Sequence, residues 1–444
     1  MVLKLNKFKI FLIIVAIVML VSCKRQQVPE IFDANVTLKN INVESIPELK
    51  FNLTYNAEIF KLIEADDGFI GCDLRQVKPD EPIGKVLVIH KIAKNGELIW
   101  TKEHSFLLKD PVITAFLNDN AGNLYLALQE RAAQKSYILK CNSTGEEVWR
   151  REFTDLSNSL FENVFITKGQ ELVAVGNWRW ANEMQTEDHS IPLEAVITKL
   201  DNDGNLLAQK SLPRFQHHLA KYDPALGIVI NASQDSTYAN TIIKLDPDCN
   251  IEWSYGAAKD EFFNYKVLEV VNGQILIVGN TLVNGYLTNS FLAKLNQNGT
   301  LVWKKENIGA VQGTFVNDRK EKIKIEKMIE QVVVREDGDI IANNYSGLII
   351  IFDQLGNEKQ RLKLELGGII KLVNDGGLIL SKQRILGRVP PPFEAAREFY
   401  NTDLVIAKYD RDYKLEWRKT FDKYINSFGY DYVYILNDGT LIVQ

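Results

Sequence analysis

Short apolar runs separated by turn residues recur along the chain from residue 65 to its end. One recurrent unit is typified by VNGQILIVGN (271–280), in which polar turn residues precede a run of Ile, Leu and Val. Such a run after Asn-Gly or Asp-Gly is typical of a tight hairpin that leads into a buried strand. We count eight such units, at residues 65–74, 120–129, 168–177, 224–233, 271–280, 336–344, 374–382 and 437–444. The pattern predicts an all-β chain.

A second unit alternates with the first and carries a tryptophan. KLNQNGTLVWKK (294–305) has a turn glycine at Gly299 and a Trp four residues later. Seven positions align with that glycine, namely Gly96, Gly145, Gly204, Cys249, Gly299, Gly356 and Tyr413. The positions four residues on are Trp100, Trp149, Ala208, Trp253, Trp303, Gln360 and Trp417. Their spacing of about 53 residues, with only strand-like patterns between them, predicts a β-propeller.

Each blade is predicted to contain two hairpins, a–b and c–d, with the Trp on the outermost strand. A ring there can cover the blade's edge and pack against the neighbouring blade, so we interpret the repeated Trp as structural. Ala208 and Gln360 mark two junctions that lack it. Cys249 and Tyr413 stand at glycine positions, so their turns either differ or carry about 1–2 kcal/mol of strain.

The blade count follows from the two kinds of hairpin. Eight a–b units and seven c–d units are present, and the chain stops halfway through a blade at TLIVQ (440–444). An open half blade would leave bare strand edges. Residues 35–56 contain an alternating segment that can supply the missing strands. The sequence predicts eight four-stranded blades, the last closed by N- and C-terminal strands, with seven blades as the alternative.

The N-terminus has the pattern of a bacterial secretion signal. Three lysines precede an apolar core at 10–21, which is short for a membrane span. LVSC (20–23) resembles the lipobox, in which a peptidase cuts before a cysteine that is then acylated. We expect residues 1–22 to be removed, residues 23–32 to form a lipidated tether that begins at Cys23, and residues 33–444 to form the propeller. The alternative is an ordinary signal anchor with an incidental cysteine.

Charge and composition restrict the partners. The formal net charge is −5, and it becomes −8 when the three lysines of the signal are removed, which argues against nucleic acid. Lys24 and Arg25 follow the acylated position, where surface-exported lipoproteins carry acidic residues. We therefore favour the periplasmic side of the outer membrane over the cell surface. The remaining cysteines show no CxxC spacing, and a chain this large needs no disulfide framework.

The spacing D-x-x-G-x-x-x-W after an apolar strand resembles the repeat of quinoprotein-dehydrogenase-like (PQQ-like) propellers, over most of residues 59–444. The same repeat occurs in many lipoproteins of Bacteroidetes. Enzymes of that family hold a quinone over an adjacent Cys-Cys pair with calcium, and no adjacent Cys pair exists here. The resemblance therefore implies the fold, and we expect no cofactor.

Strand alternation places the long, irregular segments at one end of the blades, which we call the loop face. Long loops on a rigid scaffold often carry binding sites. Aromatic and arginine side chains in these segments are our candidate binding residues: Trp178, Arg179, Trp180, Arg388, Phe393, Arg397 and Tyr400. Such residues suit protein or glycan partners, although the alternative is that they only hold the loops together.

No metal site is expected. His217 and His218 are adjacent, and neighbours in an extended chain point to opposite sides. DNDG (201–204) lacks the later ligands of a calcium loop. Two functions stay open: a non-catalytic binding or scaffold module in the envelope, which we favour, and a lyase or hydrolase that acts on a glycan or peptide at the loop face. No local hydrolase motif is found, but propeller active sites are assembled from several blades.

Overall fold

A computed structural model describes most of the repeats. The chain divides into two compact units, Met1–Ser45 and Ile46–Gln444. The described residues all belong to the second unit, and they are 59–65, 67–76, 84–94, 97–130, 135–153, 160–178, 194–212, 215–234, 239–256, 262–283, 286–316, 322–327, 329–344, 346–389, 399–426, 433–435 and 441–443. Cys23 and residues 33–56 lie outside them, so the domain boundaries predicted near the N-terminus stay predictions.

Twenty-eight strands form seven four-stranded antiparallel sheets, which are the blades. The strands of blades 1 to 4 are β1 (Ile59–Ala65), β2 (Gly68–Gln76), β3 (Gly84–Ala93), β4 (Leu98–Lys109); β5 (Pro111–Asn118), β6 (Leu124–Glu130), β7 (Lys135–Cys141), β8 (Glu147–Phe153); β9 (Leu160–Ile166), β10 (Leu172–Trp178), β11 (Glu194–Leu200), β12 (Leu206–Leu212); β13 (Phe215–Asp223), β14 (Gly227–Gln234), β15 (Ala239–Leu245) and β16 (Ile251–Gly256).

Blades 5 to 7 differ in strand length. Their strands are β17 (Phe262–Val271), β18 (Gln274–Val283), β19 (Tyr286–Leu295), β20 (Leu301–Glu306); β23 (Gln331–Val334), β24 (Ile340–Asn343), β25 (Leu348–Phe352), β26 (Glu358–Lys363); β27 (Ile369–Leu372), β28 (Leu378–Val389), β29 (Phe399–Tyr409) and β30 (Leu415–Asn426). Two further hairpins form separate two-stranded sheets: β21 (Ala310–Val316) with β22 (Lys322–Lys327), and β31 (Val433–Ile435) with β32 (Leu441–Val443).

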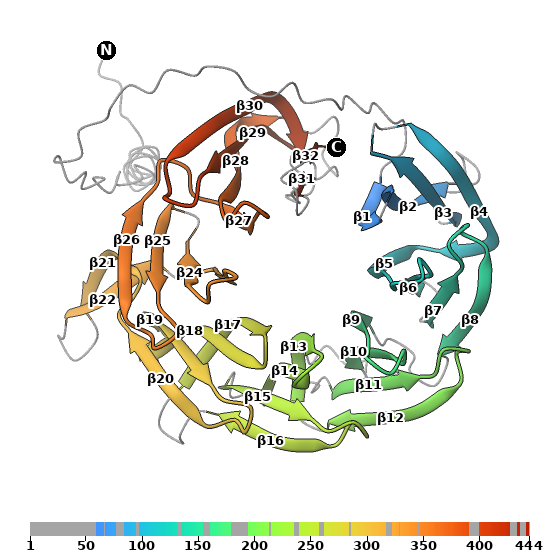
Figure 1. The fold of residues 1–444 in the computed structure, drawn as a ribbon, viewed down its shortest axis with the longest axis horizontal. Coiled ribbons are helices and arrows are strands. Elements are labelled where there is room, and N and C mark those ends of the chain that lie inside the picture. The colour runs from blue at the N-terminus through green and yellow to red at the C-terminus, as the bar shows by residue number, and fades with distance from the viewer. Residues whose placement is uncertain are drawn as a thin grey trace, which may run out of the picture. The chain divides into compact units, whose positions relative to one another are not determined.

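The strand order within each blade follows the chain, and the first strand of each blade contacts the first strand of the next from β1 to β27. Figure 1 shows these blades arranged around a common axis with the first strand of each innermost. The prediction of an all-β propeller is thus confirmed. The described strands include eight a–b hairpins and seven c–d hairpins, the numbers that the sequence pattern predicts.

Seven complete blades are described, and the eighth a–b hairpin is β31–β32. The strands expected to complete an eighth blade fall in residues 35–56, outside the described residues. Seven blades therefore fit the structure, and the eighth blade, with its closure by both chain ends, stays a prediction.

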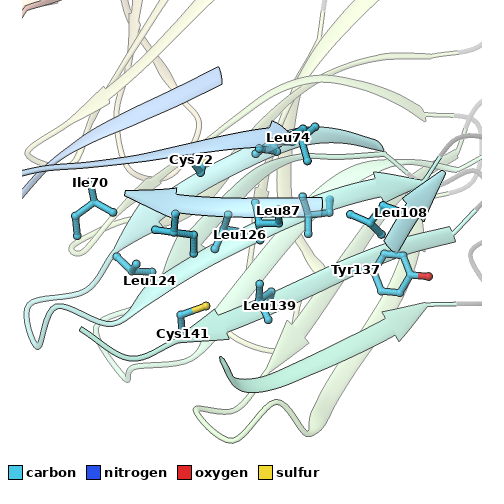
Figure 2. Packing of buried hydrophobic residues seen from close by; sticks show 13 residues of the cluster. Ile70, Cys72, Leu74, Leu87, Leu108, Leu124, Leu126, Tyr137, Leu139 and Cys141 are labelled. Atoms are coloured by element: carbon cyan, nitrogen blue, oxygen red, sulfur yellow. The ribbon is translucent and has the colours of Figure 1, made fainter. Parts of the chain in front are cut away.

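Six apolar cores lie at the six junctions between consecutive blades. Figure 2 shows the core between blades 1 and 2, where Cys72 and Leu87 of blade 1 face Leu126 and Leu139 of blade 2. Because side chains alternate along a strand, one face of each strand contributes to one junction and the other face to the next. The apolar runs of the middle strands are nearly continuous for that reason: Leu124–Leu128 of β6 are all buried.

Two segments between consecutive blades, whose sequences look irregular, contain strands. Residues 215–223 form the innermost strand β13, with a bulge between His217 and Leu219. The charged segment within 309–330 is interrupted by the hairpin β21–β22, in which Phe315 pairs with Ile323. The alternation Lys-Ile-Lys-Ile in residues 322–325 is the period of a strand, which the charges had obscured.

Among the described residues, no helix has the length and hydropathy that a membrane span requires.

Candidate binding face

The two ends of the blades carry different connections. The a–b and c–d turns lie at one end, which we call the turn face, and the b–c and blade-to-blade connections lie at the loop face. This division follows from the antiparallel order of the strands in every blade.

At the turn face, the Trp of blades 1, 2, 4 and 5 lies against the glycine turn of the next blade. The indole Nε1 of Trp149 donates to the carbonyl oxygen of Asn202 at 2.9 Å. A Cβ placed on Gly204 would approach the same indole to 2.7 Å, so only glycine leaves room for it. Trp303 repeats the arrangement, since its Nε1 donates to Gln354 O at 3.1 Å and its ring lies against Gly356. The interpretation of the Trp as interblade contacts is confirmed.

A lysine that sequence reasoning missed takes part in the same contact. Lys140 and Lys294 lie directly across the strand pair from Trp149 and Trp303. The ammonium group of Lys140 donates to Asn202 O at 3.1 Å, the carbonyl that the indole also uses. The ammonium group of Lys294 donates to Gln354 O, and burial lowers its pKa. The signal was present in the sequence as a Lys in the third strand of six blades, at Lys91, Lys140, Lys199, Lys244, Lys294 and Lys408.

The two blades without a Trp are each followed by a blade without the turn glycine. Ala208 of blade 3 is followed by Cys249, which is buried in the core between blades 3 and 4. Gln360 of blade 6 is followed by Tyr413, which packs at the junction of blades 6 and 7. Both residues keep the left-handed turn, at φ 62° and 63°. The turns at Cys249 and Tyr413 thus keep the conformation of the glycine turns, and of the two alternatives the strained turn is confirmed. A side chain at the turn occupies space that the missing indole leaves free.

Carboxylate side chains fix most of these turns internally. In the turn of blade 6, Asp353 Oδ1 accepts hydrogen bonds from the backbone N–H groups of Leu355 and Asn357. The side-chain amide of Asn357 and its backbone N–H lower the pKa of Asp353. The same type of turn is closed by Asn296 in blade 5. The turn DNDG (201–204) behaves likewise, with Asp201 bonded within its own turn.

Toward the loop face, the apolar cores end in buried polar pairs between the second and third strands. Asn280 donates through Nδ2 to Ser290 Oγ at 3.1 Å across β18 and β19. Ser233 and Asn240 occupy the corresponding paired positions of blade 4, and both are buried. Side chains able to donate and accept hydrogen bonds thus lie beneath the loop face.

Blade 7 extends far beyond its own first strand at this end. The first strand, β27, pairs with β28 only over Leu378–Ser381. Residues 382–389 of β28 stay paired with β29 through a bulge between Ile385 and Gly387, and β29 stays paired with β30 as far as Tyr400 and Asn426. At about 3.3 Å per residue, the extension of β28 is about 26 Å long. By contrast, the connection between the second and third strands of blade 6 is a tight turn at residues 344–347.

The extension of blade 7 carries two of the seven candidate binding residues. Arg388 and Tyr400 are directly paired across β28 and β29, so the register brings them together. Trp178 ends β10 in blade 3 and pairs with Glu194. Residues Arg179, Trp180, Phe393 and Arg397 lie outside the described residues, and their roles stay predictions.

One buried set resembles a catalytic cysteine with its base. Cys141 Sγ lies 3.8 Å from His104 Nε2, and His104 Nδ1 lies 3.9 Å from Glu147 Oε2. Burial raises the pKa of Cys141 to about 12, and burial also lowers the pKa of His104. A nucleophilic cysteine needs the opposite shifts, toward thiolate and imidazolium. We therefore interpret this set as part of the core between blades 1 and 2. Cys72, Cys141 and Cys249 are free thiols, all buried.

A second polar set crosses three strands of blade 1. His90 Nε2 lies 3.3 Å from Asp73 Oδ2, and His90 Nδ1 lies 3.0 Å from Thr101 Oγ1. Gly71 stands opposite His90 in the register, which leaves room for the ring to reach Asp73. By strand alternation, the set lies on the face of blade 1 that points away from blade 2. Its exposed hydroxyl belongs to an edge strand, and we assign the set no catalytic role.

The part of the chain that the structure describes contains no group of three His, Cys, Asp or Glu side chains placed to hold a metal ion. His217 and His218 belong to β13, at its bulge.

Comparison with known proteins bears on the fold. No protein-family model matches the chain, and no curated protein matches it. Among solved structures, BamB from Moraxella catarrhalis is similar at 12% identity, over 81% of this chain and 84% of that chain, with a TM-score of 0.43. AztD from Citrobacter koseri is similar at 10% identity, over 81% and 87%, with a TM-score of 0.42. The Dos1 propeller is similar at 10% identity, over 67% and 72%, with a TM-score of 0.45. At these identities the likeness concerns the fold alone.

Proposed function

We propose that the chain is a lipoprotein of the bacterial cell envelope, anchored through an acylated Cys23, whose propeller binds a protein or glycan partner at the loop face without catalysis. The anchor rests on the secretion signal and the lipobox-like LVSC. The tether of residues 23–32 spans at most about 35 Å, so the propeller would work close to the membrane.

The bonded turns at one end of the blades, together with the extension of blade 7 at the other end, are the observations that carry the binding proposal. At the turn face, indole and ammonium groups are engaged in contacts between blades, and carboxylates are engaged within turns. These bonds make a stiff support. At the loop face, blade 7 projects beyond its neighbour and carries the paired Arg388 and Tyr400. Arg and Tyr are frequent anchors in protein interfaces, because they combine contact area with hydrogen bonding.

Cross-linking in the native envelope, followed by affinity measurement with the partner that it captures, tests the proposal. Trp180→Ala, Arg388→Ala and Arg397→Ala are expected to weaken binding by about thirtyfold each, the usual loss for an anchor residue. Asn298→Ala in a turn of blade 5 is the control. Equal affinities for all four variants, with the fold intact, would place the site elsewhere.

A further inference from the structure

Exposed apolar side chains gather at one place in the repeat. Among the described residues, every large apolar side chain that is exposed lies in a c–d turn or at the first two positions of an outermost strand, beside the turn face. Blades 1 to 3, which are consecutive in Figure 1, carry five of them with exposed fractions between 41% and 53%: Leu98, Ile99, Val148, Leu206 and Leu207.

A bulge leaves one of these residues exposed in each of the three blades. The register skips Ile99 in β4, Val148 in β8 and Leu207 in β12, each directly before the Trp position. An extra residue at a bulge re-aims the side chains around it. The bulge recurs in blades 4, 6 and 7 with an exposed charged residue: Glu252, Lys359 and Glu416. The fold therefore does not require an apolar residue at this position, and the aliphatic side chains of blades 1 to 3 need another explanation.

Two half-buried indoles join these residues into a continuous surface. A Cβ on Gly145 would lie 2.7 Å from the ring of Trp100, so blade 1 meets blade 2 directly beside Val148. The ring of Trp149 lies equally close to Gly204 of blade 3, directly before Leu206 and Leu207. We call the five exposed residues, together with Trp100 and Trp149, the apolar arc. Continuous exposed apolar surface with a polar border is typical of an interaction site.

The apolar arc lies in a neutral region of an acidic chain. The hairpins that carry it, residues 94–102, 142–151 and 201–210, contain five basic and five acidic residues, whereas the whole chain has a net charge of −5. Some of these charges are paired beside the arc: Lys102 Nζ lies 3.3 Å from Glu146 Oε1, and Arg150 Nη1 lies 3.9 Å from Glu147 Oε2. Two copies of an acidic chain repel each other less through a neutral surface than through a charged one. An apolar centre with a charged rim also has the composition of a protein interface.

The direction of the chain disfavours a membrane as the occupant. Strand β1 runs from the loop face to its tight turn with β2, so the chain enters blade 1 at the loop face. An anchor at Cys23 would reach the blades from that end. The apolar arc lies at the other end, beside the turn face.

We propose that the apolar arc of blades 1 to 3 binds the same arc of a second copy of this chain, in a symmetric dimer. Exposed apolar residues recur once per blade along the arc, and a second copy presents the same spacing. A two-fold axis makes such a contact self-complementary. If the axis passes through the middle blade of the arc, Val148 of one copy lies beside Val148 of the other. The inference goes beyond the proposed function, because it concerns the end of the blades opposite the loop face.

The symmetry predicts a specific cross-link. Val148→Cys in the full chain, kept in detergent, is oxidised with copper phenanthroline, and the covalent dimer is measured on a non-reducing gel. Val302→Cys is the matched control, because Val302 is the extra residue of the same bulge in blade 5 and both Val side chains are 53% exposed. The parent chain sets the background, since Cys72, Cys141 and Cys249 are buried. We expect Val148→Cys to cross-link at least about tenfold faster than Val302→Cys, because a bound pair holds the thiols at a high effective concentration.

A buried charge tests the same contact without a covalent bond. Val148→Glu should raise the dissociation constant of the dimer at least about tenfold, because two like charges would meet in the interface. Val302→Glu should change the constant by less than about twofold, because exposed charges far from the contact are screened. The fold accommodates both variants, since Glu already occupies this bulge in blades 4 and 7. Sedimentation velocity in detergent over a range of concentrations measures the constant, and circular dichroism checks that the strands are kept.

Several results would overturn the inference. They are a monomer at every concentration, equal cross-linking of Val148→Cys and Val302→Cys, or equal losses in the two Glu variants. A fluorescent label on Val148→Cys that responds to vesicles of phosphatidylethanolamine and phosphatidylglycerol, with no dimer formed, would assign the arc to a lipid surface instead. If a native partner is cross-linked at the loop face while the chain stays monomeric, this inference fails and the proposed function stands.

Discussion

The contact between Trp303 and Gly356 predicts that substitutions in two different blades depend on each other. Gly356→Ala adds a Cβ only 2.7 Å from Trp303 Cδ2, at a backbone φ of 80°. The left-handed conformation costs about 1–2 kcal/mol, and the overlap with the indole adds about 1–3 kcal/mol. Trp303→Ala should cost about 3 kcal/mol, at the lower end for a Trp because the ring is only half-buried.

The double variant should be more stable than the sum of the single losses implies. Once the indole is gone, the Cβ has room, and Gly356→Ala should cost only its backbone strain. The expected interaction energy is therefore about 1–3 kcal/mol, measured by urea unfolding with far-UV circular dichroism. Gly376→Ala, alone and combined with Trp303→Ala, is the control. The φ of Gly376 is also 80°, but a Cβ there would meet only the Arg411 side chain, at an ordinary distance of 3.5 Å, so its loss should add to that of Trp303→Ala. Losses that add to within about 0.5 kcal/mol would refute the reasoning.

Three further predictions concern other parts of the chain. Asp353→Asn keeps an oxygen for the turn but removes the group that titrates. Because the pKa of Asp353 is lowered in the folded chain, the ionised carboxylate stabilises the fold above about pH 4, and this stabilisation is lost below it. The difference in unfolding free energy between parent and variant, measured in urea, should therefore narrow as the pH falls from 5 to 3, and a constant difference would contradict this. Val88 of blade 1 and Ile406 of blade 7 are fully buried on the faces that point away from the described junctions. Deletion of residues 33–57 should therefore lower the melting temperature, and an unchanged melting curve would favour a propeller that closes without that segment. Cys23→Ser should abolish acyl labelling and leave an uncleaved precursor, and normal maturation would rule the anchor out.

Features set by local sequence could be predicted, and those set by neighbouring blades could not. A turn residue followed four positions later by Trp predicts where the outermost strand begins, because the geometry of a hairpin depends on residues that are close in sequence. Its contact with the glycine of the next blade joins residues such as Trp149 and Gly204, which are 55 positions apart. A signal was nevertheless present: Ala208 is followed one repeat later by Cys249, and Gln360 by Tyr413. The extension of blade 7 was interpreted as a loop because its Arg and Gly residues mask the strand period, which pairing with β29 stabilises.

The offset between each indole and the turn that holds it affects how such a chain can change over generations. The two halves of one contact belong to different repeats, so the cost of replacing the glycine depends on whether the preceding repeat carries the Trp. Cys249 and Tyr413 are accommodated because the preceding repeats have Ala208 and Gln360 in place of the Trp. Duplication or loss of a whole repeat avoids this barrier, since every typical repeat brings one Trp and one glycine and the match at each border is kept. We therefore expect lineages of this chain to gain or lose entire blades more readily than they exchange a single Trp.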